Sequence, residues 1–446
     1  MSWAALLLLV LCLAAAGLGV LCRLRVPVSL SLALATGAVA LHVVLQIETL
    51  AGVRWSFLES WALGVLGVVA LWRARRPPRV APGSWTGGWG DGVALVSLIA
   101  LALLCARAAI DNPDFVYHWG AKGRKFAAAA GIDLAFLGPP SGWHLHPDYP
   151  NLLPELFAFT ARLGGGWVDG TALLWTAVAG AALILAAREA LAPVDRALRQ
   201  VVVAGLCAAL LAAAFALELA GNADLLVSWA LVLAVPALLV PRSAGATARV
   251  GIAAALAASS KIEGVPLAAF MILAFLVARR AAPGPPAVGR ERWTRLAFVL
   301  LPTILVVAPW LWINLRHGLF LPGNTGQLSL SRLALAVPEA LAVLWSPAWS
   351  GLPLTLVALP WLCIARRTRW AAWVSVAQLG FYFWIYGSAT ADSARYVQWS
   401  FARLLLHVLP AVWVLCALCW TPAAEAGESD EEARGLRPGS KIDDVR

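Results

Sequence analysis

The residues best suited to chemistry are concentrated in one stretch, 111–166, which carries carboxylates, lysines and histidines at short spacing. Near its start, Asn112 is a good helix N-cap and Pro113 a good first helical residue, so the sequence predicts that a helix begins there. Asp111 lies just before that helix and could approach the same place as its first side chains.

One face of this predicted helix combines a carboxylate with cations. At 100° per residue, four polar positions fall within about 80° of one another. They are Asp114, His118, Lys122 and Lys125. A general base beside phosphate-binding cations would need this set of side chains. An ordinary solvated face with i,i+4 pairing would show the same spacing, and on this motif alone both interpretations stay open.

The second half of the stretch, HLHPDYPNLLPE, is rich in proline. We expect the chain to be extended through His146–Pro150 and a helix to start near Pro154, with 152–164 amphipathic and interfacial. His144, His146 and Asp148 could hold a divalent metal, because imidazole and carboxylate suit several such ions. The alternative is a hydrogen-bonded loop without metal.

Further polar clusters stand where apolar segments end. They are Glu218, Asn222 and Asp224; Lys261 and Glu263; Asn314, Arg316 and His317; Asp392 and Arg395; and Arg403 just inside the last apolar segment. Any one of these could be a helix-end residue that reaches water. Transport would instead favour polar groups at mid-membrane depth.

The elements that must position these residues are apolar helices. Of 446 residues 61% are hydrophobic and 13% charged, with a mean hydropathy of +0.79, which is more apolar surface than a soluble fold can hide. The sequence predicts an all-α, polytopic transmembrane protein of about 13 spans. The expected spans are 3–22, 27–45, 56–72, 92–110, 168–187, 200–217, 223–241, 246–260, 263–279, 296–314, 350–365, 370–388 and 402–420.

Charge in the connecting loops predicts the orientation of these spans. The net charge of +10 comes largely from arginines at span ends, which argues for topology rather than a nucleic-acid partner. Alternate loops are the basic ones, so the N-terminus is expected outside and the C-terminus in the cytoplasm. All the polar clusters then share the outer side. The excess of arginine over lysine suggests a GC-rich bacterial genome. The expected location is a bacterial inner (plasma) membrane.

Four regions follow from this topology. They are N-terminal spans in 1–110, a large periplasmic loop in 111–166, a transmembrane core in 167–420 and a disordered cytosolic tail in 421–446. The first span lacks a basic n-region and a cleavage site, so we expect it to be retained. Cys416 and Cys419 spell C-x-x-C within an apolar run and are expected to be small hydrophobes.

Several motifs resemble one family when they are taken in order. They are D-x-x-x-x-W-x-x-K at Asp114–Trp119–Lys122, then HPDYPNLLPE, GNADLL, SSKIEG and YVQWSFARLLLHVLP. Together they resemble the bacterial multispan GT-C glycosyltransferases, the superfamily of the aminoarabinose and protein mannosyl transferases. The resemblance covers about 110–410. In the best-known members the catalytic loop follows the first span, whereas here four predicted spans precede it.

The resemblance implies a polyprenyl-phosphate-linked sugar donor and a glycan or lipid acceptor at the outer face. Asp114 matches the catalytic carboxylate, with Asp111 as a second candidate. Donor phosphate would meet Lys122, Lys261, Arg395 and Arg403. Substrate would meet His118, His146, Asp148, Tyr149, Glu263 and Asp224.

The expected function is therefore transfer of a sugar by a membrane enzyme, with membrane lipids around it and no certain cofactor beyond a divalent metal that could assist. Other classes stay open: a transporter or flippase of lipid-linked saccharides, a polymerase or ligase of lipid-linked glycans, and a non-catalytic relative.

Overall fold

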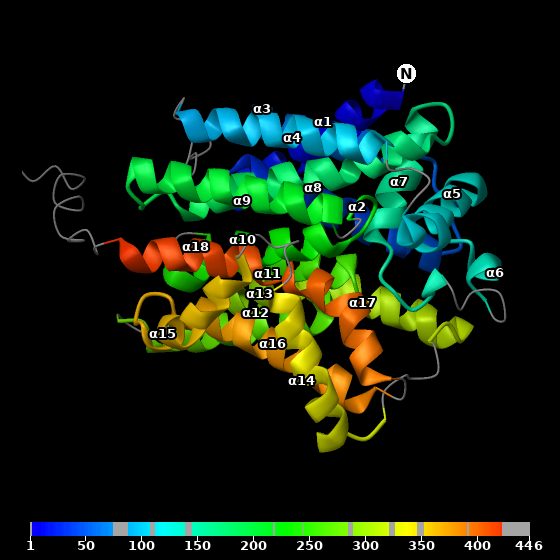
Figure 1. The fold of residues 1–446 in the computed structure, drawn as a ribbon. Helices are drawn as coiled ribbons and strands as arrows, with labels where there is room; N and C mark the ends of the chain where they lie inside the picture. The colour runs from blue at the N-terminus through cyan, green and yellow to red at the C-terminus, as the bar shows by residue number, and fades with distance from the viewer. Residues whose placement is uncertain are drawn as a thin grey trace, which may run out of the picture.

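The computed structural model describes residues 2–74, 88–107, 112–138, 145–216, 219–243, 245–283, 289–320, 326–345, 352–389 and 392–421. Over these residues the protein is built of helices, without a β-strand (Figure 1). The expected tail falls outside the described residues from 422 onward. Asp111, His144 and Glu218 also lie outside them.

The first helices are α1 (Ser2–Arg23), α2 (Leu30–Leu50), α3 (Glu59–Trp72) and α4 (Trp89–Arg107). The loop region holds η1 (Phe115–Trp119), α5 (Gly120–Ala129), α6 (Leu134–Leu137) and α7 (Leu152–Leu163). The core holds α8 (Asp169–Ala190), α9 (Arg196–Ala216), α10 (Asp224–Leu239), α11 (Ala246–Ser260), α12 (Gly264–Ala281) and α13 (Arg290–His317). The last elements are α14 (Leu330–Leu344), η4 (Leu352–Ala358), α15 (Leu359–Ile364), α16 (Arg369–Ser388), α17 (Ser393–Leu405) and α18 (Leu409–Trp420).

Seven of the described helices are long and apolar enough to cross a bilayer: α1, α2, α4, α8, α9, α12 and α13. α17 and α18 pass the same test together, although they are bent by 48°. Three other expected spans, α3, α10 and α11, have only 14 to 16 residues. At 1.5 Å per residue they are shorter than a hydrocarbon core of about 30 Å. The apolar helices indicate a membrane protein, while a count of thirteen spans stays a prediction.

Small residues let the N-terminal helices pack closely. A side-chain carbon on Gly17 of α1 would lie 1.8 Å from the carbonyl oxygen of Ala33 in α2. The same addition to Gly67 of α3 would lie 2.1 Å from the carbonyl oxygen of Ala15. Such backbone approach is typical of helix pairs in lipid, where packing rather than water exclusion holds helices together.

α10 is the central helix of the bundle. Its residues are buried all round except Pro236 and Leu239, in contact with α8, α11, α12 and α18. A helix that is apolar on every side is expected in the interior. Its first residue, Asp224, is therefore fixed inside the protein.

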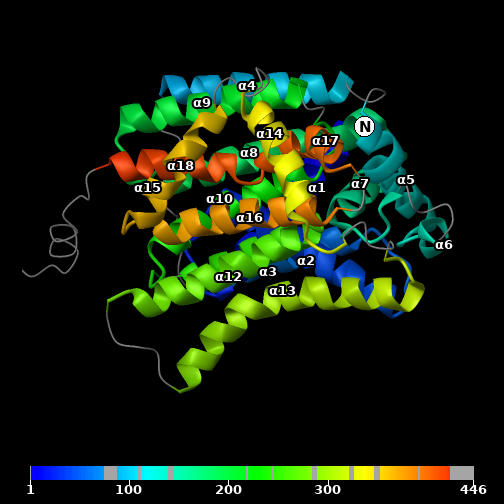
Figure 2. The same ribbon diagram turned by 60° about the horizontal axis from the view of Figure 1, so that its bottom comes forward.

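The loop helices gather at one end of the long helices. Figures 1 and 2 both show α5, α6 and α7 at this end, together with the beginning of α1. α18 ends at the opposite end.

Candidate functional site

The helix expected after Asn112 is present, and its start places Asp114. The Asn112 Oδ1 accepts a hydrogen bond from the Asp114 backbone N–H at 3.0 Å, as an N-cap does. Its Nδ2 donates to the carbonyl oxygen of Ala220 at 2.5 Å, which ties the helix start to the segment before α10. The following turn, η1, is a π-helix, so the predicted 100° spacing does not hold through it.

The Asp114 carboxylate forms an ion pair with the Arg403 guanidinium, which is 289 residues away in the chain. Both side chains are partly open, with exposed fractions of 38% for Asp114 and 26% for Arg403. Arg403 also lies within electrostatic reach of Asp224. The pair is therefore the accessible edge of a larger polar cluster.

The buried part of that cluster is centred on Asp224. One of its oxygens, Oδ1, accepts hydrogen bonds from Lys261 Nζ and from His407 Nε2, both at 2.8 Å. The Asp224 side chain has no exposed surface and that of Lys261 only 9%. The other oxygen, Oδ2, has no hydrogen-bond partner among the described residues. Burial of one lysine and one carboxylate is tolerable here because each compensates the charge of the other.

A chain of hydrogen bonds orients His407. Its Nε2 lies against the Asp224 carboxylate, and its Nδ1 is 2.5 Å from the Tyr382 hydroxyl, within hydrogen-bond distance. Gln378, one turn earlier on α16, donates to that hydroxyl at 2.8 Å and to the Glu263 carbonyl at 3.0 Å. This chain holds α16 against the breaks before α12 and α18.

Three helix breaks converge on this cluster. Asp224 begins α10, Lys261 stands between α11 and α12, and His407 lies in the bend between α17 and α18. Backbone groups at such breaks cannot complete a helix ladder, so polar side chains collect there. The short helix α10 therefore begins at the polar cluster, and the short helix α11 ends at it.

The loop contributes two imidazole rings and one phenol ring next to the buried cluster. The rings of His118, His146 and Tyr149 lie 4.8 to 5.4 Å apart, centroid to centroid. The hydroxyl of Tyr149 is 3.5 Å from Glu263 Oε1, which is itself 3.7 Å from Lys261 Nζ. Glu263 thus joins the loop to the buried cluster.

Lys122 contacts these rings' segment at His146 and is fully buried. Its Nζ donates to the carbonyl oxygen of His146 at 2.8 Å and stands 5.5 Å from the Trp119 ring centroid. Burial lowers the pKa of Lys122 to about 7, against a smaller opposing effect of Asp148. Lys125, predicted on the same face, is exposed and lies over the Phe136 ring instead.

The same surroundings keep both histidines neutral. Burial lowers the pKa of His118 well below its usual value, and the positive charge of Lys122 adds to the effect. Burial and Lys122 likewise lower the pKa of His146. Burial raises the pKa of the Asp148 carboxyl and of the Tyr149 hydroxyl. Neutral rings and a hydroxyl suit hydrogen bonding to sugar hydroxyls better than they suit charge compensation.

Two expectations about the proline-rich segment are wrong. His146–Pro150 is a turn, closed by a hydrogen bond from the Tyr149 N–H to the His146 carbonyl at 3.0 Å, and His146 has a φ of +43°. The Asp148 carbonyl accepts from Trp310 Nε1 of α13 at 3.1 Å, an anchor that the sequence does not reveal.

The helix expected at 152–164 is present as α7, but it lacks the water-facing side expected of an interfacial helix, because Leu152 to Ala161 are all buried. Glu155 explains this: its carboxylate meets His42 Nδ1 at 2.7 Å and Gln46 Nε2 at 3.0 Å, both on α2. Glu155, which suggests a solvent-exposed face when only the sequence is considered, is hydrogen-bonded inside the protein.

The predicted site residues therefore divide into groups. Those brought into one cluster are Asp114, His118, Lys122, His146, Asp148, Tyr149, Asp224, Lys261, Glu263 and Arg403. Arg395 is exposed at the start of α17 and stacks over the Trp399 ring at 4.5 Å. Asp111 and His144 are outside the described residues, within which no group of three or more His, Cys, Asp or Glu side chains could hold a metal ion.

Sequence reasoning assigned no role to His407, Tyr382 and Gln378. A signal was present: His407 follows Arg403 by four residues, one helical turn, and Gln378 precedes Tyr382 by four within an apolar helix. Asn222 was noted only as a loop residue, yet its Oδ1 accepts from Trp119 Nε1 at 3.0 Å.

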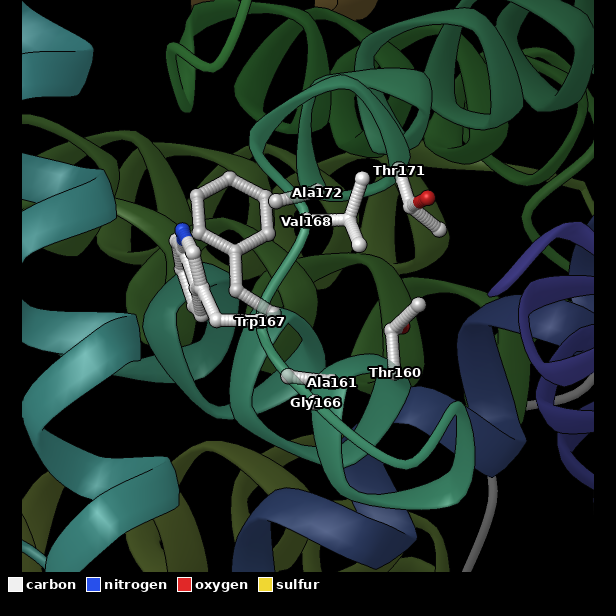
Figure 3. Close-up of a pocket in the computed structure, with 8 residues that line it drawn as sticks. Thr160, Ala161, Gly166, Trp167, Val168, Thr171 and Ala172 are labelled. Atoms are coloured by element: carbon white, nitrogen blue, oxygen red, sulfur yellow. The ribbon is translucent and has the colours of Figure 1, made fainter. Parts of the chain in front are cut away.

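A small hollow near the loop is structural rather than a binding site. Figure 3 shows Trp167 on one side of it and Thr160 and Thr171 on the other, where α7 is followed by α8. Its space is too small to admit a water molecule. Thr160 is held by the Trp175 Nε1–H, which donates to its hydroxyl at 2.8 Å. The hollow shares no lining residue with the polar cluster.

Comparison with known proteins gives no relative: no protein-family model, no curated protein and no solved structure matches the chain. Function must therefore be argued from the site itself.

Proposed function

We propose that the protein is a membrane glycosyltransferase of the GT-C kind, which transfers a sugar from a polyprenyl-phosphate donor to a glycan or lipid acceptor. The observation that carries this proposal is the partly open Asp114–Arg403 ion pair beside the buried Asp224–Lys261 pair. It offers a carboxylate and a guanidinium at one accessible point, which are the two groups that displacement of a lipid phosphate needs.

The Arg403 guanidinium binds the phosphate of the donor, since its planar fork matches phosphate oxygens. Competition from the phosphate loosens the ion pair and frees the Asp114 carboxylate. The acceptor oxygen attacks the anomeric carbon, the bond from that carbon to the phosphate oxygen breaks, and Asp114 takes the hydroxyl proton. The lipid phosphate leaves with the bonding electrons, and Arg403 stabilises its charge.

The remaining polar residues have supporting roles in this scheme. Lys261 and His407 hold Asp224, whose negative charge keeps Arg403 in place. His118, His146 and Tyr149 face the sugar as neutral hydrogen-bonding groups. Lys122, predicted as a phosphate ligand, instead supports the His146 turn from below, because its ammonium is committed to a backbone carbonyl.

We further propose that the cluster works at the outer leaflet of a bacterial inner membrane, with thirteen spans, the N-terminus outside and the C-terminus in the cytoplasm. Loop charge supports this orientation. The beginning of α1 and the loop helices lie at one end of the long helices and the end of α18 at the other, which an odd number of crossings requires (Figure 1).

One observation favours a transporter or flippase of lipid-linked saccharides as the second candidate. Broken helices that meet at buried ionisable residues are typical of transporters, and here the breaks at Asp224, Lys261 and His407 converge. A flippase would move the lipid-linked sugar without consuming it. A polymerase or ligase would transfer an oligosaccharide rather than one sugar.

The test uses the full-length protein in proteoliposomes with mannosyl and aminoarabinosyl polyprenyl phosphates as donors and a membrane glycolipid extract as acceptor. Loss of the lipid-linked sugar and release of polyprenyl phosphate are measured. Asp114→Asn is expected to lower transfer about 100- to 10,000-fold, which is the contribution typical of a general base. The amide also loses the pairing with Arg403.

Asp133→Asn is the matched control. Asp133 lies in the same loop and caps α6 by accepting from the Phe136 N–H, which asparagine does equally well. It should leave transfer unchanged. Near-normal transfer by a folded Asp114→Asn protein contradicts the proposed mechanism, and movement of intact donor across the bilayer supports the flippase instead.

A further inference from the structure

A second polar site lies at the end of the bundle away from the loop helices. A cavity of about 520 Å³ opens between the last turns of α12, the first turns of α13 and the segment between α10 and α11. Figure 2 shows that α12 ends and α13 begins far from α5, α6 and α7. Five arginines line it: Arg242, Arg279, Arg280, Arg292 and Arg295.

The arginines converge from three separate segments, which loop topology alone does not require. A positive cytoplasmic loop needs only net charge near the membrane surface. Guanidinium groups around one cavity repel each other, and no described residue that lines it is acidic. Glu291, one turn from Arg295 and paired with it, does not line the cavity. Arg279 also donates to the Pro241 carbonyl at 2.6 Å, which does not neutralise its charge. An anion between the guanidinium groups would reduce their mutual repulsion.

The cavity also has an apolar floor. Phe275 of α12 and Val299 of α13 line it and are buried. Beyond the cavity the same two helices present apolar side chains outward, among them Leu273, Leu301 and Ile304, each more than half exposed. A long apolar chain that leaves the cavity would therefore continue along these helices.

We propose that this cavity binds the headgroup of an anionic phospholipid. Its phosphate lies among the arginines, whose forks match phosphate oxygens, and an acyl chain follows the outward faces of α12 and α13. Basic pockets between membrane helices on the cytoplasmic side bind lipid headgroups in this way. The volume is within the range of small-molecule sites and exceeds what a free phosphate would fill. The site is independent of the polar cluster at Asp114.

The test compares phosphatidylglycerol, phosphatidylcholine of the same acyl chains, and inorganic phosphate as ligands of the full-length protein in nonionic micelles. Bound lipid is counted by native mass spectrometry. The variant Arg280→Gln/Arg292→Gln removes two exposed cavity arginines, and Arg73→Gln/Arg366→Gln removes two exposed arginines next to α3 and α15, outside the cavity.

Phosphatidylglycerol should bind the wild type and the Arg73/Arg366 variant at equal strength, and the Arg280/Arg292 variant at least about tenfold more weakly. Phosphatidylcholine and inorganic phosphate should bind all three weakly. An equal loss of phosphatidylglycerol binding in both variants would mean that general surface charge attracts the lipid, and it would contradict a specific site. Tight binding of inorganic phosphate alone, or equal binding of the two lipids, would overturn the assignment to an anionic lipid.

Discussion

Replacement of Lys122 by methionine tests the burial of this lysine directly. Methionine keeps the length and the apolar stem of the side chain but removes the ammonium group. The His146 carbonyl then loses its donor, which costs about 1–3 kcal/mol of stability at every pH. A second effect on stability depends on pH and reports the charge of the lysine alone.

That second effect follows from the lowered pKa. Burial lowers the pKa of Lys122 from 10.5 to about 7. Between these values the unfolded chain holds a proton that the folded protein has released, so the free energy of unfolding rises by about 1.4 kcal/mol per pH unit. The penalty is complete below pH 7 and disappears above pH 10.5. From pH 7 to pH 9 the wild type should therefore gain about 2 kcal/mol relative to Lys122→Met.

The assay is equilibrium unfolding in mixed micelles of sodium dodecyl sulfate and a nonionic detergent, at pH 7 and pH 9. Lys125→Met is the matched control, because Lys125 lies on the same helix and is exposed. Its unfolding curves should shift with pH as those of the wild type do. Parallel pH dependence of the wild type and Lys122→Met would show that Lys122 keeps its charge when folded, and the reasoning would be refuted.

Two further predictions concern the buried cluster and the packing of α11 on α12. Lys261→Met should lower the free energy of unfolding by about 3–5 kcal/mol, because the buried Asp224 carboxylate would lose the ammonium group that is paired with it. Lys261→Met/Asp224→Asn should recover much of this loss, and a double variant no more stable than the single one would argue against the pair. Gly264→Ala should lower stability by about 1–3 kcal/mol, since its added carbon would lie 1.9 Å from the Ala257 carbonyl oxygen, whereas Gly380→Ala, which meets nothing, should not. Equal thermal midpoints for the two glycine variants would contradict a close packing of α11 on α12.

Local signals in the sequence were sufficient for some features of the site. Asn112 and Pro113 predicted where the helix of Asp114 begins, because an N-cap acts through its nearest backbone groups. The clusters at Asp224 and at Lys261 stood between apolar segments, and both are helix breaks. Such features depend on neighbours along the chain, so sequence reasoning reaches them.

Other features could not be read in this way. The proline-rich segment turns at His146 instead of running extended because Lys122 and Trp310 hold its carbonyl groups from other elements. α7 is buried because α2 supplies partners for Glu155. In each case a side chain distant in the sequence forms the hydrogen bond, and the spacing of apolar residues along the chain cannot predict such a contact.

The sequence by itself determined that the protein is helical and apolar enough for a membrane, since composition and segment length decide that property. It also marked most of the polar residues that matter. Only the tertiary structure decided which of them meet. Asp114 and Arg403 are 289 residues apart, and His407 reaches Asp224 across 183, so their pairing depends on how the helices pack. Burial also distinguishes the two ion pairs. Asp114 and Arg403 are partly exposed to solvent, whereas Asp224 and Lys261 are buried and each neutralises the charge of the other.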